Sequence, residues 1–165
     1  MFTGKAGFYL EGEWELTTAQ SIKGLKFGMV PVPQLFDKPA NQADSHTFVL
    51  PKKDRTPAQR AQAMGFIKSM LDQSYTWAQG GHIPAYLPLR NSQKYKDLEP
   101  QADYASAAAR AVYDPEAWYS GSGSTFETIA GSQLGLVQQG SLSPDAALSA
   151  ISDQLQVYLR TPSPL

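Results

Sequence analysis

The residues best suited to binding a ligand are a tryptophan at the expected edge of a strand and the polar residues next to it in sequence. Trp14 follows Gly12 and Glu13 directly behind the apolar run 6–10, so we expect a strand to end there and to present the indole at an edge. The C–H bonds of a sugar ring pack well on the electron-rich face of an indole. A tryptophan near a strand end also commonly anchors a core or its rim, so both roles stay open.

Motifs for bond-breaking chemistry are missing. The two histidines, His46 and His82, lie far apart, and the sequence contains no HExxH, no glycine-rich phosphate loop and no GxSxG. The stretch 121–124 could expose a serine hydroxyl, but no motif pairs it with a base. Glu11, Glu13 and Glu15 alternate and could share a face, although a solvated strand edge is the more typical explanation. We therefore expect a protein that is not an enzyme.

Composition narrows the possible partners. The chain has 165 residues, 42% of them hydrophobic and 18% charged, which is typical of a globular protein with a core. A net charge of −1 without a basic run argues against a nucleic-acid partner. The absence of cysteine excludes disulfides and thiolate ligands, and we expect no cofactor and no metal. The sequence from Met1 leads directly into a strand pattern, so this chain shows no signal peptide.

Hydrophobic periodicity predicts a mixed α/β fold in which helices dominate. Proline and glycine punctuation favours short strands near 6–11, 27–32 and 46–50. Helices are predicted over 17–22, 57–79, 92–98, 102–113, 126–139 and from 144 to the residues before Pro162.

Two packing expectations accompany these helices. The helix predicted over 57–79 should turn an apolar stripe toward the core, and Trp77 should extend this stripe. The stripe consists of Ala63, Phe66, Ile67, Met70 and Leu71. Gly131 and Gly135 suggest close packing of a later helix against a neighbour.

Five segments follow one another in the order seen in a family of transport proteins. The first runs from Phe2–Gly7 to Gly12–Trp14 and is similar to a gly-lys-ala strand followed by gly-x-trp. The second, Phe27–Pro33, is similar to phe-gly-val-x-pro-x-pro, and the third is Asp44–Lys52. The fourth, Trp77–Ala85, is similar to trp-ala-x-x-gly-x-ile-pro-ala, and the fifth, Leu142–Leu148, is similar to ser-pro-glu-glu-ala-leu. Together they resemble the C-terminal part of a family 1 extracellular solute-binding protein, the sugar-binding subunit of ABC importers.

The resemblance implies the helix-rich C-terminal portion of a type II periplasmic-binding-protein-like fold, in which two α/β lobes close on a sugar by a hinge motion. Residues 1–36 would belong to the C-terminal lobe, 37–44 would cross between lobes, 45–100 would belong to the N-terminal lobe, and 101–165 would supply C-terminal lobe helices. It also implies a full-length protein that is extracellular, as a membrane-anchored lipoprotein or in the periplasm, with ABC transporter permease subunits as partners.

The same resemblance assigns ligand-binding residues. Trp14 matches the stacking tryptophan, and Glu13 precedes it. Ser45, His46, Gly81 and His82 fall in loops that face the cleft in the family. Trp118 and Tyr119 precede the loop 121–124 and could also line the cleft. A core role for His46, and a packing role for Trp118 and Tyr119, remain open. A carbohydrate-active enzyme fragment or a free-standing carbohydrate-interaction module would use the same aromatic residues. Because the family is longer than this chain, we also expect uncovered apolar faces and self-association.

Overall fold

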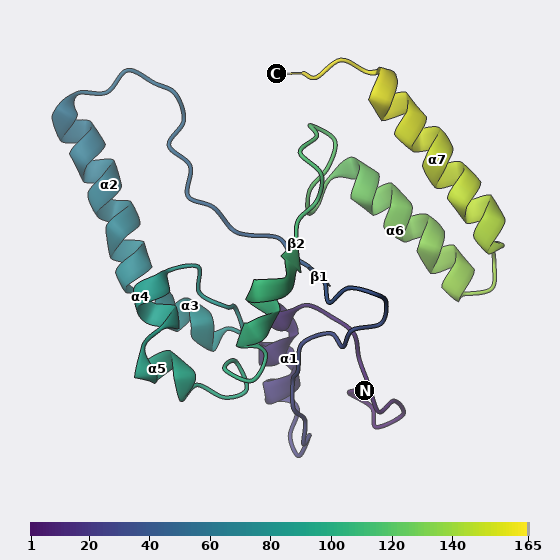
Figure 1. Ribbon diagram of the computed structural model, residues 1–165, viewed down its shortest axis with the longest axis horizontal. Coiled ribbons are helices and arrows are strands. Elements are labelled where there is room, and N and C mark those ends of the chain that lie inside the picture. The colour runs from purple at the N-terminus through teal and green to yellow at the C-terminus, as the bar shows by residue number, and fades with distance from the viewer. Residues whose placement is uncertain (165) are drawn as a thin grey trace. The chain divides into compact units, whose positions relative to one another are not determined.

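The computed structural model describes residues 1–164 and divides the chain into two compact units (Figure 1). Unit 1 comprises Met1–Asn41 and His46–Ala111, and unit 2 comprises Gln42–Ser45 and Val112–Leu165. Helices dominate both units, which agrees with the predicted mixed, helix-rich class. The lobe boundaries drawn from the resemblance stay a prediction.

The centre of unit 1 forms where an N-terminal helix meets later segments. The 3-10 helix η1 (Glu13–Glu15) runs directly into α1 (Leu16–Ser21), which confirms the helix predicted near 17–22. Leu16 and Ala19 of α1 are buried. The other buried apolar side chains of unit 1 come from later elements and are Ala78, Tyr95 and Tyr104. Burial of these few side chains is what joins η1 and α1 to residues 78–104.

Helix α2 (Pro57–Asp72) begins at a capping box. The Gln59 amide N–H donates to the Thr56 hydroxyl at 3.2 Å, and the Thr56 N–H donates to the Gln59 side chain at 3.0 Å. The helix is interrupted at Gln73 and continues as α3 (Ser74–Gln79), so the predicted helix over 57–79 is correct apart from this break. The inward stripe is wrong, because α2 buries no residue and Phe66 is 64% exposed.

Two short helices and a 3-10 helix complete unit 1. They are α4 (Leu87–Arg90), α5 (Gln93–Lys96) and η2 (Ala105–Arg110). Ser92 caps α5 by accepting the N–H of Tyr95, as the helix predicted over 92–98 requires. The helix predicted over 102–113 is confirmed only over Ala105–Arg110, as the 3-10 helix η2, and the chain then forms strand β2 (Ala111–Val112).

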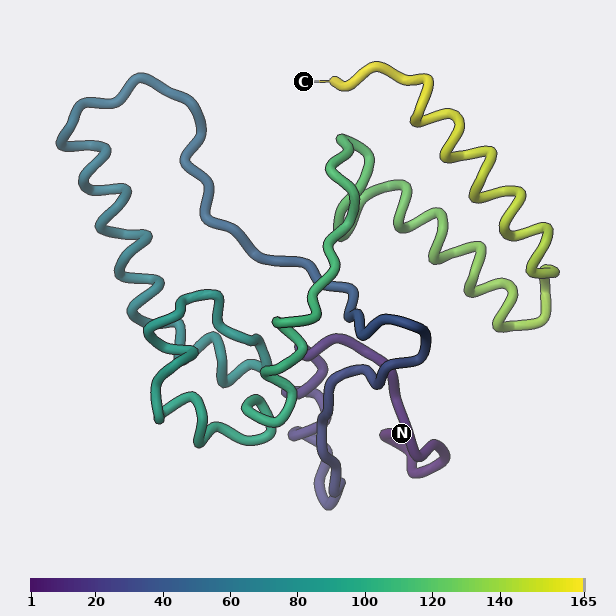
Figure 2. The backbone as a smooth tube through the Cα atoms, viewed as in Figure 1, coloured from purple at the N-terminus to yellow at the C-terminus, as the bar shows by residue number. Residues whose placement is uncertain are grey.

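The strands predicted near 6–11, 27–32 and 46–50 are wrong. Within residues 1–164 the strands are β1 (Asn41–Gln42) and β2, which form a two-stranded parallel sheet. The three predicted segments are irregular chain outside any helix or strand, and Figure 2 shows their course along the backbone. Pro31 and Pro33 cannot donate ladder hydrogen bonds, and an apolar run needs a neighbouring strand to become one.

Unit 2 is built on a helical hairpin. Helices α6 (Thr125–Gln138) and α7 (Pro144–Arg160) pack side by side, with Ser124 and Ser143 as side-chain N-caps. Gly140, at φ +73°, allows the turn between them and directly follows the helix predicted over 126–139. Close packing at Gly131 and Gly135 is wrong, because a Cβ at either would meet open space.

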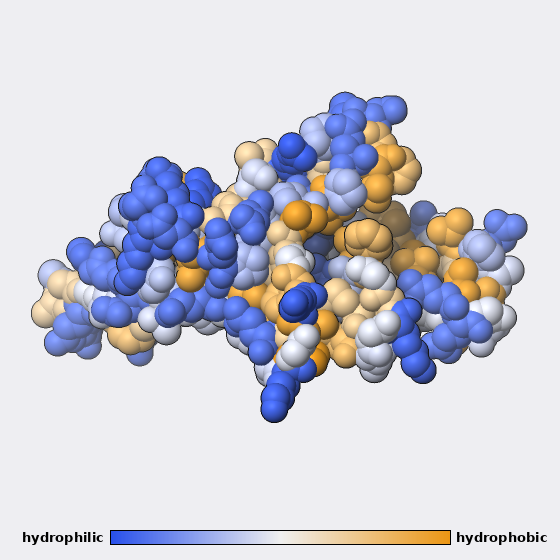
Figure 3. Space-filling model, turned by 90° about the horizontal axis from the view of Figure 1, so that it is seen from below, coloured by the Kyte–Doolittle hydropathy of each residue, from blue (hydrophilic) through white to orange (hydrophobic). Residues whose placement is uncertain are grey.

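Large apolar side chains are exposed on both units (Figure 3). Phe8 is 97% exposed and Phe36 is 84% exposed in unit 1. On α7 of unit 2, Leu148 and Leu159 are also exposed. A stable monomer rarely leaves so much apolar surface in water.

Candidate functional site

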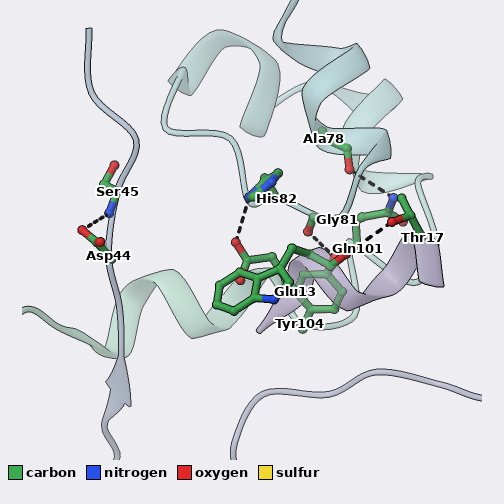
Figure 4. A network of polar contacts seen from close by, with 10 residues as sticks. Glu13, Thr17, Asp44, Ser45, Ala78, Gly81, His82, Gln101 and Tyr104 are labelled. Atoms are coloured by element: carbon green, nitrogen blue, oxygen red, sulfur yellow. Dashed lines mark hydrogen bonds and ion pairs between the residues drawn. The ribbon is translucent and has the colours of Figure 1, made fainter. Parts of the chain in front are cut away.

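Two candidate binding residues from distant parts of the chain meet in unit 1. A carboxylate oxygen of Glu13 lies 2.9 Å from Nδ1 of His82, and both side chains are partly buried (Figure 4). An ionised carboxylate only accepts hydrogen bonds, so this contact places the imidazole proton on Nδ1. In the neutral form of the ring, Nε2 is an acceptor, which suits a hydroxyl donor on a ligand.

A glycine makes this meeting possible. Gly81 has φ +113°, and a Cβ there would collide with the backbone carbonyl of Glu13 and press on Leu16. The Tyr104 hydroxyl donates a hydrogen bond to the Gly81 carbonyl. Gly81 is therefore a positioning residue, because its missing side chain lets the segment before His82 lie against η1.

Buried polar side chains form hydrogen bonds to the segment that precedes His82. The side-chain amide of Gln101 donates to the carbonyls of Ala78 at 3.1 Å and Gln79 at 3.2 Å. The Tyr95 hydroxyl donates to the Gln101 carbonyl at 3.3 Å. Burial raises the pKa of the Tyr95 hydroxyl to about 12 and also raises the pKa of the Tyr104 hydroxyl. Both hydroxyls are therefore protonated donors at neutral pH.

Aromatic rings surround the His82 side of the pair. The Trp77 indole stacks on the His82 imidazole, with centroids 4.6 Å apart and planes 19° apart. His46 meets Trp77 and His82 edge to face, at 5.4 Å and 5.6 Å. We call Trp77, His46 and His82 the histidine–tryptophan cluster. His46 is an exposed member of this cluster, so a core role for it is wrong.

Trp14 directly follows Glu13 in sequence, but it does not lie at the end of a strand as expected. It belongs to η1 instead of following a strand, and its indole is 55% exposed. The six-membered ring occupies the space where a Cβ on Gly12 would lie. Glycine at position 12 thus lets the indole fold back over the chain, with the rest of the ring surface open to solvent.

The remaining candidates lie in unit 2. Ser45 is exposed, and its backbone N–H donates to the Asp44 carboxylate at 2.7 Å. Trp118 and Tyr119 pack on Tyr158 of α7, with Tyr119 stacked at 5.5 Å and Trp118 edge to face at 5.5 Å. Phe126 contacts both tyrosines. The packing role left open for Trp118 and Tyr119 is the one observed.

Sequence reasoning missed three residues of the unit 1 site. Trp77 was expected to pack as an extension of the inward stripe, which is wrong, because it is 52% exposed and stacks on His82. Tyr104 and Gln101 act on residues more than twenty positions away, and no local motif marks such partners. The i, i+5 spacing of Trp77 and His82 across a glycine pair was the available signal for the stack.

Two further findings concern metal binding and membrane crossing. Among the described residues, no three His, Cys, Asp or Glu side chains are grouped so that they could hold a metal ion. Within the same residues, none of the helices combines the length and apolar character that crossing a membrane requires. The unit 1 site consists of hydrogen-bonding groups and aromatic rings.

Comparisons with protein-family models, with curated proteins and with solved structures find no match for this chain.

Proposed function

We propose that this chain is the C-terminal part of an extracellular substrate-binding protein that captures an oligosaccharide for an ABC importer. The observation that carries the proposal is the Glu13–His82 contact. Residues 13–14 and 81–82 come from two motifs that the resemblance assigns to a sugar cleft, and this contact holds them together in unit 1.

The side chains of this site suit a neutral polyhydroxylated ligand. Sugar sites combine aromatic platforms with a few fixed hydrogen-bonding groups. Trp14 and Trp77 are both about half exposed and offer ring faces. Glu13 can accept a hydrogen bond from a ligand hydroxyl, and Nε2 of His82 can accept a second one. Capture of a sugar by these groups breaks no bond, so the proposed protein is not an enzyme.

Calorimetric titration of the complete gene product with a panel of oligosaccharides tests this function. Trp14→Ala should weaken binding by roughly 10- to 100-fold, the effect of losing one stacked indole worth about 1–3 kcal/mol. Trp77→Ala should also weaken binding, because its indole faces solvent beside His82. Phe36→Ala is the matched control, since it removes an exposed ring outside the site and should leave affinity unchanged. Equal affinity of wild type and Trp14→Ala would refute the platform assignment.

The coding sequence upstream of Met1 offers an independent test. A lipoprotein signal followed by βα units would support the transporter assignment, and the absence of both would contradict it. Hydrolysis of an aryl glycoside by the protein would favour the alternative of a carbohydrate-active enzyme. Most such enzymes use two carboxylates flanking the bond, whereas the described site contributes one, Glu13.

A further inference from the structure

A pocket of unit 1 carries two basic side chains, Arg90 and Lys96, in its lining. This pocket has a volume of about 430 Å³ and lies among α4, α5 and η2. Its lining residues are Arg90, Tyr95, Lys96, Ala102, Ala105 and Ser106. All of them fall within seventeen consecutive positions, 90–106, so the pocket is a local feature of unit 1. We call it the Arg90–Lys96 pocket.

The two cations of this pocket are not neutralised by neighbouring carboxylates. No acidic residue lines the pocket, and within residues 1–164 the ion pairs are Lys68–Asp72 and His82–Glu13. Asp97, next to Lys96 in sequence, instead accepts a hydrogen bond from the Gln93 side chain at 2.7 Å. Two like charges beside one hollow repel each other unless an anion lies between them.

Hydrogen bonds and a buried ring tie together the segments that line the pocket. The Ser92 cap begins α5, and the Ala102 N–H donates to the Leu98 carbonyl at 2.8 Å. The buried ring of Tyr95 is tied by its hydroxyl to the Gln101 carbonyl. Burial raises the pKa of the Tyr95 hydroxyl, the positive charge of Arg90 lowers it, and the negative charge of Glu13 raises it.

We infer that the Arg90–Lys96 pocket binds a small organic anion, a carboxylate or phosphate group carried on a body about the size of a monosaccharide. The guanidinium fork of Arg90 matches two oxygens of such a group, and Lys96 adds a point charge. The Ser106 hydroxyl can donate to a third oxygen, while Ala102 and Ala105 supply apolar contact for the body. Pockets of this volume lie within the range that holds small molecules.

A structural explanation makes a different prediction. Arg90 and Lys96 stand in the last turns of α4 and α5, where a cation is favoured by the exposed carbonyl groups of a helix end. In that case the two side chains would stabilise the helix ends and would bind no ligand selectively. Binding measurements with matched charge variants separate the two explanations.

The decisive experiment is a calorimetric titration of the chain at low salt with glucose 6-phosphate, glucuronate, inorganic phosphate and neutral glucose. We expect saturable one-site binding of at least one of the two sugar anions, weaker binding of inorganic phosphate and none of glucose. The first two ligands distinguish a phosphate source from a carboxylate source of the anion. A lack of saturable binding by both sugar anions would overturn the inference.

Variants test the location of binding. Arg90→Gln and Lys96→Gln should each weaken it by about tenfold or more. Lys94→Gln is the matched control, because Lys94 lies over the Tyr75 ring outside the pocket lining and carries the same charge. Ser106→Glu places a carboxylate at an exposed lining position and should abolish binding without unfolding the chain, which a thermal melt checks. Equal weakening by Lys94→Gln and Arg90→Gln would show non-specific attraction and overturn the site.

Discussion

The carboxylate of Glu13 lies 2.9 Å from Nδ1 of His82, although the two residues are 69 positions apart in sequence. The contact depends on the backbone as well as on the side chains, because Gly81 comes against the carbonyl of Glu13. A histidine brought this close to a carboxylate is fixed in orientation and tautomer, as residues that recognise ligands commonly are. The neighbouring glycine is thus as much a part of the site as the pair itself.

Gly81→Ala should destabilise unit 1 strongly. A side chain at φ +113° is strained, and its Cβ would collide with the Glu13 backbone, so we expect a loss of at least ~2 kcal/mol in the free energy of unfolding. Gly131→Ala is the matched control, because that helical glycine faces open space; it should gain roughly 0.5–1 kcal/mol. Urea unfolding measures both. Equal effects of the two substitutions would contradict the close approach.

Gln101→Met should cost about 1–3 kcal/mol of stability despite preserving the side-chain size. The Gln101 amide satisfies the carbonyls of Ala78 and Gln79 in a buried place, and methionine would leave them without this donor. Gln93→Met, at an exposed position, should stay within about 0.5 kcal/mol of wild type. Thermal and urea unfolding compare the two, and a neutral Gln101→Met would show that the amide bonds contribute little.

Local signals in the sequence predicted helix ends better than any other feature. The helices predicted to begin at 57, 92, 126 and 144 begin at Pro57, Gln93, Thr125 and Pro144, because helix starts depend on a few neighbouring residues. Strands failed because their formation depends on a partner strand, which an apolar run such as 6–11 does not specify. The stripe on α2 failed for a similar reason: periodicity identifies an apolar face but not whether anything covers it.

The candidate site was predictable only in part. A motif order placed Glu13, Trp14, His46 and His82 together, and three of these side chains lie in one set of contacts. The Gln101 and Tyr104 hydrogen bonds are long-range and involve backbone carbonyls, which carry no sequence identity. Local patterning therefore could not reveal the residues that support the site.

Stability should fall at alkaline pH because of Tyr95. Its pKa is about 12 in the folded chain and 10.0 ordinarily, so the folded state holds this proton more tightly. The contribution is fully present below pH 10 and is lost as pH rises from about 10 to about 12, at up to ~1.4 kcal/mol per pH unit. Tyr104 acts in the same direction. Urea unfolding across this range, beside the absorbance of tyrosinate, measures the effect.

The Tyr95 contribution has its own variant. Tyr95→Phe should make the alkaline loss shallower, at a cost of about 1 kcal/mol for the hydroxyl bond to Gln101. Tyr113→Phe, at an exposed position, is the control and should leave the slope as in wild type. A slope unchanged by Tyr95→Phe would show that other groups govern the alkaline transition.

The exposed apolar side chains should drive self-association. Apolar area is exposed to water at Phe8 and Phe36 of unit 1 and at Leu148 and Leu159 of unit 2. Burying this area on association is favourable by about 25 cal/mol per Å². Light scattering should therefore give an apparent mass that rises with protein concentration, and the melting temperature should rise with it.

Leu148→Lys and Leu159→Lys together should reduce this dependence, because charge on α7 opposes burial of that face. Lys68→Glu on α2 is a control for charge at an already polar position. A monomer that melts cooperatively at low concentration, with a melting temperature independent of concentration, would contradict the prediction and show that this surface is tolerated in water.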